Sequence, residues 1–238
     1  MGTLYIVATP IGNLQDITLR AIQILKSADA IACEDTRKTG ILLQQIIPTY
    51  EVGSTEPRRS RLISYYEQNE LQRIPEILNA LKNGLNVALV SDAGTPTISD
   101  PGFKLVRECI REGIKVESIP GPSSVITSLV SSGLPTDKFL FVGYPPRKPG
   151  HRKALFENLT KLQYCIKVTI IMFEAPHKIV QTLQELKEVF GDMDIAISRE
   201  LTKVHEEIRR EKISSSIEHF SKITPKGEFV ILFNLKYE

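Results

Sequence analysis

Cysteine is scarce in this 238-residue sequence, and its three copies, Cys33, Cys109 and Cys165, stand far apart in apolar surroundings. An odd number without C-x-x-C spacing argues against both a disulfide framework and a zinc cluster. We therefore expect the three thiols to be buried, reduced and structural. Histidine is also sparse, and His205-Glu206 does not begin a zinc-protease motif because position 209 is arginine. The sequence predicts no metal site.

Long hydrophobic runs and a strong excess of one charge are absent as well. No apolar stretch approaches the length of a membrane span, and the first residues enter a predicted strand without a signal peptide. The formal net charge is only +2, so nucleic-acid binding would depend on local basic patches. Hydrophobic residues at 42% and charged residues at 24% are typical of a packed globular protein. These features predict a cytoplasmic protein with no membrane partner.

Phosphate-binding glycine motifs are missing from the most informative stretch, which runs from 86 to 102. An apolar run at 87–90 has the pattern of a strand buried on both faces. The sequence SDAGTPTISDPG follows at 91–102 and is called the 91–102 loop below. We expect Asp100 to cap the next helix and Pro101 to begin it. The loop is longer than most strand-to-helix connections and follows a strand end, where ligands bind in open α/β sheets. Without G-x-G-x-x-G or G-x-x-x-x-G-K-[ST], a nucleotide-like ligand would be held by contacts other than a phosphate grip.

The order of predicted elements indicates two α/β domains. Strands predicted at 4–8, 30–33, 62–65, 87–90 and 116–119 alternate with helical patterns, which is typical of a parallel sheet. The turn-rich sequence PGPSS at 120–124 is the expected junction, with domains at 1–119 and 120–238. Beyond it, strands are predicted at 139–142, 168–173, 195–198 and 229–235, and the charged stretch 205–212 has no predicted element.

Four polar residues, Glu34, Asp35, Thr36 and Arg37, directly follow the buried strand at 30–33. Capping of the next helix by Asp35 or Thr36 would explain one or two of them. Because it does not explain all four, we favour a functional role for this segment.

Eight motifs stand at predicted strand ends: TPIGN at 9–13, EDTR at 34–37, SDAGTPTISDPG at 91–102, PGPSS at 120–124, PPRK at 145–148, EAPHK at 174–178, RELTK at 199–203 and KGEFV at 226–230. In this order, over nearly the whole chain, they resemble the ribosomal RNA small subunit methyltransferase I family. That family belongs to the tetrapyrrole methylase superfamily of S-adenosylmethionine-dependent enzymes. Gln68 stands where the family usually has histidine, and Glu211 follows Arg210 where glycine is usual, which leaves the role of that histidine and the form of the later loop open.

The resemblance implies two α/β domains of the tetrapyrrole methylase type, with S-adenosylmethionine in the interdomain cleft, and a homodimer. It also implies methylation of the ribose 2′-hydroxyl of a cytidine in 16S ribosomal RNA, in the decoding centre of the small subunit. The residues that the resemblance assigns to the cofactor are Pro10, Asp92, Gly94, Thr95, Ile98, Ser123, Ser124, Phe173, Leu201 and Gly227.

A ribose hydroxyl is a weak nucleophile, so a base or a nearby cation that favours alkoxide character would help methyl transfer. The candidates at strand ends are Glu34, Asp35, Glu200 and Lys203. An ordinary surface ion pair is the alternative for Glu200 and Lys203. The expected RNA contacts are Arg37, Asn69, Arg58, Arg59, Arg61, Arg147, Lys148, Arg152, Lys153 and Arg199.

Two other functions stay open from the sequence. A precorrin or uroporphyrinogen C-methyltransferase, or a diphthine synthase-like enzyme, would share the fold. Those relatives tend to carry a glycine-rich first loop in place of TPIGN and lack EDTR and RELTK. An RNA-binding ribosome assembly factor without catalysis is the alternative from another class, and it would bind RNA without transferring a methyl group.

Overall fold

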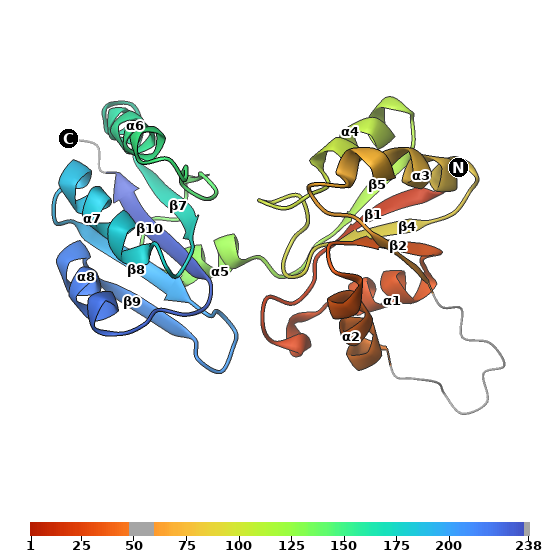
Figure 1. Ribbon diagram of the computed structural model, residues 1–238, viewed down its shortest axis with the longest axis horizontal. Coiled ribbons are helices and arrows are strands. Elements are labelled where there is room, and N and C mark those ends of the chain that lie inside the picture. Colours follow the sequence, from red (N-terminus) through yellow and green to blue (C-terminus); the bar gives the residue numbers. More distant parts are fainter. Residues whose placement is uncertain (48–59, 236–238) are drawn as a thin grey trace. The chain divides into compact units, whose positions relative to one another are not determined.

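Two five-stranded sheets organise the chain in the computed structural model, which describes residues 1–47 and 60–235 (Figure 1). The contacts divide the chain into two compact units, Met1–Ser123 and Ser124–Glu238, called the N-terminal and C-terminal units below. The expected domain boundary after residue 119 stays a prediction, since internal contacts do not test independent folding.

The N-terminal unit is built on a parallel sheet in the order β3-β2-β4-β1-β5. Its strands are β1 (Thr3–Val7), β2 (Ala30–Cys33), β3 (Arg61–Ser64), β4 (Val87–Val90) and β5 (Lys115–Ile119). Every residue of β2 and β4 is buried, as expected for strands covered on both faces. The carboxyl ends of all five strands therefore lie at the same end of the sheet, called its carboxyl edge below. The expected ligand-binding loops begin there.

Helices cover both faces of this sheet. Its helices are the 3₁₀ turn η1 (Leu14–Asp16), α1 (Leu19–Ser27), α2 (Thr36–Ile46), α3 (Glu70–Lys82) and α4 (Phe103–Arg111). Figure 1 shows α1 and α2 on one face and α3 and α4 on the other, and the two apolar cores divide in the same way. Thr18 caps α1 by accepting a hydrogen bond from the Ala21 amide.

The C-terminal unit has a mixed sheet in the order β6-β7-β10-β8-β9. Only β6 and β7 pair in parallel, whereas the other neighbours are antiparallel. The strands are β6 (Phe139–Phe141), β7 (Val168–Glu174), β8 (Asp194–Arg199), β9 (Glu207–Lys212) and β10 (Phe229–Leu235). The helices are α5 (Ser124–Ser131), α6 (Pro149–Thr160), η2 (Lys161–Tyr164), α7 (Ile179–Phe190) and α8 (Ile213–Lys222). Apolar residues of α6, α7 and α8 share one core with the central strands.

The expected start of α4 was wrong. The helix begins at Phe103, its N-cap is Gly102 and no side chain caps it, so neither Asp100 nor Pro101 has the expected role. Gly102 has a φ of +130° and cannot belong to a right-handed helix. A Cβ at this position would lie 2.6 Å from Leu89 Cδ2, so a side chain would displace the packed Leu89 side chain in addition to the strain of the positive φ. The turn therefore extends through Gly102 before the helix starts.

Two further expectations need correction. Most of the charged stretch 205–212 forms β9, which pairs with β8 from Arg199↔Glu207 to Asp194↔Lys212 at the edge of the sheet. Charged side chains suit an edge strand because they discourage pairing with other chains. Cys165 is exposed in the turn after η2, whereas Cys33 and Cys109 are buried as expected. Within the described ranges, no helix is long and apolar enough to cross a membrane.

Candidate active site

Three loops of the N-terminal unit are joined at the carboxyl edge of its sheet. After β1 and β4, Thr9 and Gly94 exchange two backbone hydrogen bonds, Thr9 N to Gly94 O at 2.9 Å and Gly94 N to Thr9 O at 3.0 Å. The Thr95 hydroxyl donates to the Pro122 carbonyl at 3.0 Å, which links the 91–102 loop to the segment after β5. Gly121 fits against β1, since a Cβ there would lie 3.0 Å from the Ala8 Cβ. Open α/β sheets bind ligands at this position.

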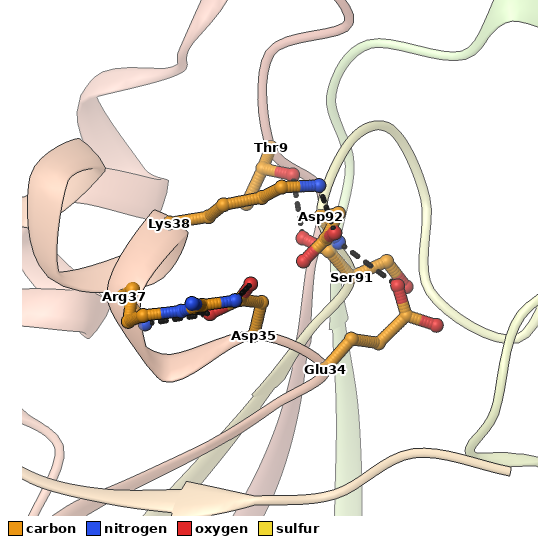
Figure 2. A network of polar contacts seen from close by, with 7 residues as sticks. All are labelled: Thr9, Glu34, Asp35, Arg37, Lys38, Ser91 and Asp92. Atoms are coloured by element: carbon orange, nitrogen blue, oxygen red, sulfur yellow. Dashed lines mark hydrogen bonds and ion pairs between the residues drawn. The ribbon is translucent and has the colours of Figure 1, made fainter.

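The loop after β2 joins the same group through the contacts drawn in Figure 2. Lys38 reaches from α2 to Asp92, with 2.7 Å between Nζ and Oδ2. The Asp92 amide donates to Glu34 Oε2 at 3.3 Å. The Thr9 hydroxyl donates to the Ser91 carbonyl at 3.2 Å. Thus the structure brings Glu34 and Asp92 together and adds Lys38, which the sequence does not single out.

Asp35 and Arg37 form hydrogen bonds mainly with each other. Asp35 caps α2 by accepting from the Arg37 amide at 2.9 Å. The Arg37 guanidinium also donates to both Asp35 carboxylate oxygens, at 3.1 and 2.8 Å. The side-chain hydrogen bond from Arg37 and the backbone bond hold the Asp35 pKa far below its usual range. Asp35 is therefore a weak proton acceptor, and the helix-capping alternative accounts for it.

Glu34 has the opposite electrostatics. Burial raises the pKa of its carboxyl, and the negative charges of Asp100 and Asp92 raise it further, whereas the Asp92 amide and Lys38 oppose the rise. A carboxylate with a raised pKa is a better general base near neutral pH. Of the two adjacent carboxylates, Glu34 is the one suited to accept a proton.

The backbone is strained in two of the expected site motifs. Among the described residues other than glycine, positive φ occurs at Thr97 (74°), Ser99 (62°), Glu200 (50°) and Thr202 (65°). The first two lie in the 91–102 loop and the other two in RELTK. Such conformations cost about 1–3 kcal/mol each and concentrate at functional sites. The strain supports the assignment of these motifs to a binding or catalytic site.

A buried glutamate fixes the far end of the 91–102 loop. Glu70 opens α3 and its side chain is 5% exposed. It accepts hydrogen bonds from the Tyr65 hydroxyl at 2.9 Å and from the Gly102 amide at 3.2 Å, and Lys104 Nζ lies 3.0 Å away. Burial alone would raise its pKa, but the hydrogen bonds from Lys104 and Tyr65 lower it. The sequence does not single out Glu70, because a glutamate in the first turn of a helix is ordinary.

In the C-terminal unit, the RELTK loop at 199–203 is hydrogen-bonded to the KGEFV segment at 226–230. Lys203 Nζ lies 2.9 Å from Glu200 Oε1 and 3.4 Å from Glu228 Oε2. The Glu228 amide donates to the Glu200 carboxylate, and the Glu200 amide donates to the Glu228 carbonyl. Gly227 has a φ of +90°, and a Cβ there would lie 2.4 Å from Glu200 Oε1. The loops therefore require glycine at 227 to approach each other.

This arrangement keeps Lys203 protonated. Burial would lower its pKa, but the hydrogen bond to Glu200 and the charges of Glu228 and Glu200 raise it. Burial likewise opposes ionisation of Glu200, yet Lys203 and the Glu228 amide lower its pKa. Their side chains are only 32% and 21% exposed, so the pair is less screened by solvent than an ordinary surface pair. Lys203 is suited to act as a fixed cation rather than as a base.

The other expected cofactor residues vary in exposure. Leu201 is buried, whereas Ile98 is exposed. Phe173 is half-buried, with its ring centroid 4.8 Å from that of Phe141 and 5.4 Å from that of Tyr144. Pro10 follows the Thr9 bridge, Ser123 ends the N-terminal unit and Ser124 begins α5. These assignments stay predictions.

Arg152 is the one expected RNA contact that the structure contradicts. Its side chain is 2% exposed, and the guanidinium pairs with both carboxylate oxygens of Glu185. It also donates to the carbonyls of Pro146 and Arg147. A buried, fully engaged guanidinium cannot reach a phosphate, so Arg152 stabilises the start of α6 instead.

The remaining basic residues stay candidates. Arg61 is exposed and pairs with Glu76 at 2.7 Å, and Lys153 lies 3.9 Å from Glu157. Arg147 and Lys148 are exposed before α6, Arg199 pairs with Glu207 at 3.2 Å, and Arg37 is 87% exposed. The Asn69 side chain donates from Nδ2 to the Ser64 carbonyl and accepts at Oδ1 from the Tyr66 amide, so it shapes the turn before α3. Arg58 and Arg59 lie outside the described residues.

No three His, Cys, Asp or Glu side chains form a group that could hold a metal ion in the described part of the chain.

The sequence profile of the Tetrapyrrole (Corrin/Porphyrin) Methylases matches residues 3–216. The chain is 44% identical over 236 residues to Ribosomal RNA small subunit methyltransferase I of Thermotoga maritima, with 99% of this chain and 100% of that protein covered. The chain belongs to the ribosomal RNA small subunit methyltransferase I family. Membership in this family makes it a methyltransferase, as the motifs predicted.

Two more comparisons agree with the family. The protein of the same name from a Hydrogenobaculum species is 46% identical, with 97% of this chain and 95% of that protein covered. The structure of uroporphyrin-III C-methyl transferase from Thermus thermophilus, complexed with S-adenyl homocysteine, aligns with a TM-score of 0.63. It is 18% identical, and the alignment covers 97% of each chain. At that identity the likeness shows the fold alone, and the predicted tetrapyrrole methylase type of α/β fold is thereby confirmed.

Proposed function

We propose that this chain transfers a methyl group from S-adenosylmethionine to the ribose 2′-hydroxyl of a cytidine in 16S ribosomal RNA. Family membership supports the reaction class and the ribosomal RNA of the small subunit as the substrate. The observation that carries the proposal is the convergence of hydrogen-bonded loops at the carboxyl edge of β1, β2, β4 and β5. These loops contain the motifs that the family resemblance assigned to the donor and to the reacting hydroxyl.

The residues at this edge fit S-adenosylmethionine. Its adenosine and methionine parts carry no phosphate, and the 91–102 loop correspondingly lacks a phosphate-binding motif. Gly94, with φ of +80°, leaves the backbone open for close approach, and Asp92 offers a carboxylate to hydroxyl or ammonium groups. We assign Pro10, Asp92, Gly94, Thr95 and Ile98 to donor binding. From the later part of the chain we add Ser123, Ser124, Phe173, Leu201 and Gly227.

When bound, S-adenosylmethionine supplies an electrophilic methyl group on a sulfonium. The protein must then orient the ribose hydroxyl and favour its alkoxide character. We assign proton acceptance to Glu34, whose pKa is raised, and electrostatic stabilisation of the oxygen to Lys203, whose pKa is also raised. Glu200 holds Lys203 in place, and Asp35 orients Arg37 toward an RNA phosphate. Orientation of well-placed reactants can contribute about 7–11 kcal/mol to lowering the barrier.

The finer description of the partners is also a proposal. We propose that the substrate is the assembled small subunit, in its decoding centre, that the chain acts as a homodimer, and that it works in the cytoplasm, where ribosomes are.

The proposal is tested by supplying labelled S-adenosylmethionine and small ribosomal subunits that lack the mark, and then mapping the label. We expect one labelled cytidine, with the methyl group on the ribose oxygen. A label on a base, or on a tetrapyrrole in a parallel reaction, would refute it. RNA binding without any label would instead support an assembly factor.

A further inference from the structure

The outer face of α4 carries exposed residues that the candidate active site does not use. Phe103, Arg107, Ile110 and Arg111 recur at helical spacing and are all exposed. Phe103 is 64% exposed and Ile110 65%. The Arg107 guanidinium carbon lies 5.7 Å from the centre of the Phe103 ring, within the range of a cation–π contact. An aromatic ring and a guanidinium are thus presented together to solvent.

A groove of about 450 Å³ lies beside this face, between α3 and α4. Its α3 side includes the apolar residues Leu71, Ile74, Pro75 and Leu78, followed by Asn79 and Lys82. Proline has no amide hydrogen, so the Leu71 carbonyl lacks the helical hydrogen bond that residue 75 would normally donate. The apolar part of the groove therefore lies where the hydrogen-bond pattern of α3 is interrupted.

The α4 side of the groove is cationic. Lys104, Arg107 and Arg111 line it together with one carboxylate, Glu108, over eight residues or about 10 Å of helix. Lys104 also contacts the buried Glu70, and Arg111 pairs with Glu108 at 2.5 Å. Arg107 is 63% exposed and lies 3.9 Å from Glu108, which makes it the cation held most loosely of the three. A row of positive charge suits a chain of phosphates better than a single anion.

The position of the groove points to the same partner. Helix α4 begins directly after Gly102, where the 91–102 loop ends. A nucleic acid strand that enters the candidate active site would therefore pass close to Phe103. Proteins that bind unpaired nucleotides combine aromatic or arginine stacking platforms with cations that follow the backbone.

We propose that the α4 face and the α3–α4 groove bind an unstacked nucleotide of single-stranded RNA that flanks the methylated residue. Phe103 and Arg107 stack on the base, and Arg107 and Arg111 contact the adjacent phosphates. This inference rests on the proposed function and adds an RNA contact outside the motifs shared with the family.

The test compares the full chain with Phe103→Ala, Phe103→Tyr and Arg107→Gln, using 16S RNA extracted from unmethylated subunits and the subunits themselves. Leu19→Ala and Arg20→Gln are matched controls, since both residues are exposed on α1, on the other face of the sheet. We expect Phe103→Ala to weaken RNA binding roughly 5- to 150-fold, the usual loss of one stacked base, and Phe103→Tyr to bind normally. Arg107→Gln should make the slope of log affinity against log salt about 0.7 less negative.

Calorimetric binding of S-adenosylhomocysteine is measured for every variant and should equal that of the wild type. Unchanged RNA affinity in Phe103→Ala and Arg107→Gln would overturn the inference. So would losses seen with assembled subunits but not with extracted RNA, because the face would then contact a ribosomal protein. An equal loss in the α1 controls would also overturn it. Failure of the wild type to methylate subunits would instead refute the proposed function, which separates the two results.

Discussion

Glu34 and Asp35 are adjacent carboxylates whose pKa values shift in opposite directions. Asp35 faces its own guanidinium partner, Arg37, whereas Glu34 is half-buried near Asp100 and Asp92. Their neighbours in space, rather than their identity, therefore decide which one can accept a proton at neutral pH. The sequence placed both at the end of β2 and could not separate them.

Replacing Glu34 by glutamine should separate activity from stability. A carboxyl whose pKa is raised on folding stabilises the fold most below its unfolded pKa, and that contribution is lost as the pH rises through the folded pKa. At pH 7.5 the variant should therefore unfold at the same temperature as the wild type or higher, while single-turnover methyl transfer falls roughly 10²- to 10⁴-fold. The wild-type rate should increase with pH above the ordinary glutamate value of 4.5, and the variant should lack this increase. A wild-type rate in the variant would exclude Glu34 as the base.

Lys203→Ala should abolish methyl transfer and leave the affinity for S-adenosylhomocysteine nearly unchanged. The physical reason is that the ammonium, held by Glu200 and Glu228, acts on the developing oxygen charge. Lys222→Ala is the control, because Lys222 forms an exposed pair with Glu218. The measurement is the single-turnover rate of both variants and the wild type with saturating donor. Full activity in Lys203→Ala would remove Lys203 from the mechanism.

At the scale of elements, Glu70 connects α3 to the start of α4 and to the 91–102 loop. Glu70→Gln should weaken the contacts to Gly102 and Lys104 and leave Lys104 without its buried partner, at a cost of about 1–3 kcal/mol in unfolding free energy. Donor affinity should fall as well, because the strained loop loses one fixed end.

Glu76→Gln is the matched change on the same helix, since Glu76 forms surface pairs with Arg61 and Arg73. It should cost no more than about 1 kcal/mol in unfolding free energy. Chemical denaturation and calorimetry measure both quantities. Equal donor affinity in Glu70→Gln and the wild type would show that the loop holds its shape without this carboxylate.

Arg152 provides a second prediction at this scale. Arg152→Met leaves the Glu185 carboxylate, which is 21% exposed, without its partner, so the free energy of unfolding should fall by about 1–3 kcal/mol. The double variant with Glu185→Met should recover part of that loss, because no unpaired charge remains. RNA affinity measured on the folded protein should not change, and a selective loss of RNA affinity would restore Arg152 as an RNA contact.

The elements that the sequence predicted well are those with local signals. Apolar runs identified β2 and β4, and the turn residues at 120–124 fall at the division between the units. The charged β9 was missed because it lies at the edge of the described sheet, next to β8, where charged side chains replace the apolar pattern of a buried strand. The start of α4 was misplaced because Gly102 must pack against Leu89, a contact distant in sequence. Arg152 was wrongly predicted to contact RNA because its burial depends on Glu185, which is distant in sequence. Glu70 was missed because its buried contact is with Gly102, which is also distant.

For the whole molecule, each unit contains its complete sheet and its own core. Fragments 1–123 and 124–238 should therefore each fold and unfold cooperatively when produced separately. If both units contribute donor contacts, neither fragment alone should bind S-adenosylhomocysteine with the affinity of the full chain. Circular dichroism and calorimetry test these expectations. A fragment that stays unfolded would show that its unit is not an independent domain.

The three cysteines differ in exposure, so a thiol-reactive label should modify one of them selectively in the native chain. Burial raises the pKa of Cys33, and that of Cys109 to about 11, so both remain thiols that electrophiles cannot reach. Cys165 is exposed to solvent. A maleimide fluorophore or a nitroxide should therefore attach at this one position without any mutation, and its signal would test whether the chain binds small-subunit ribosomal RNA.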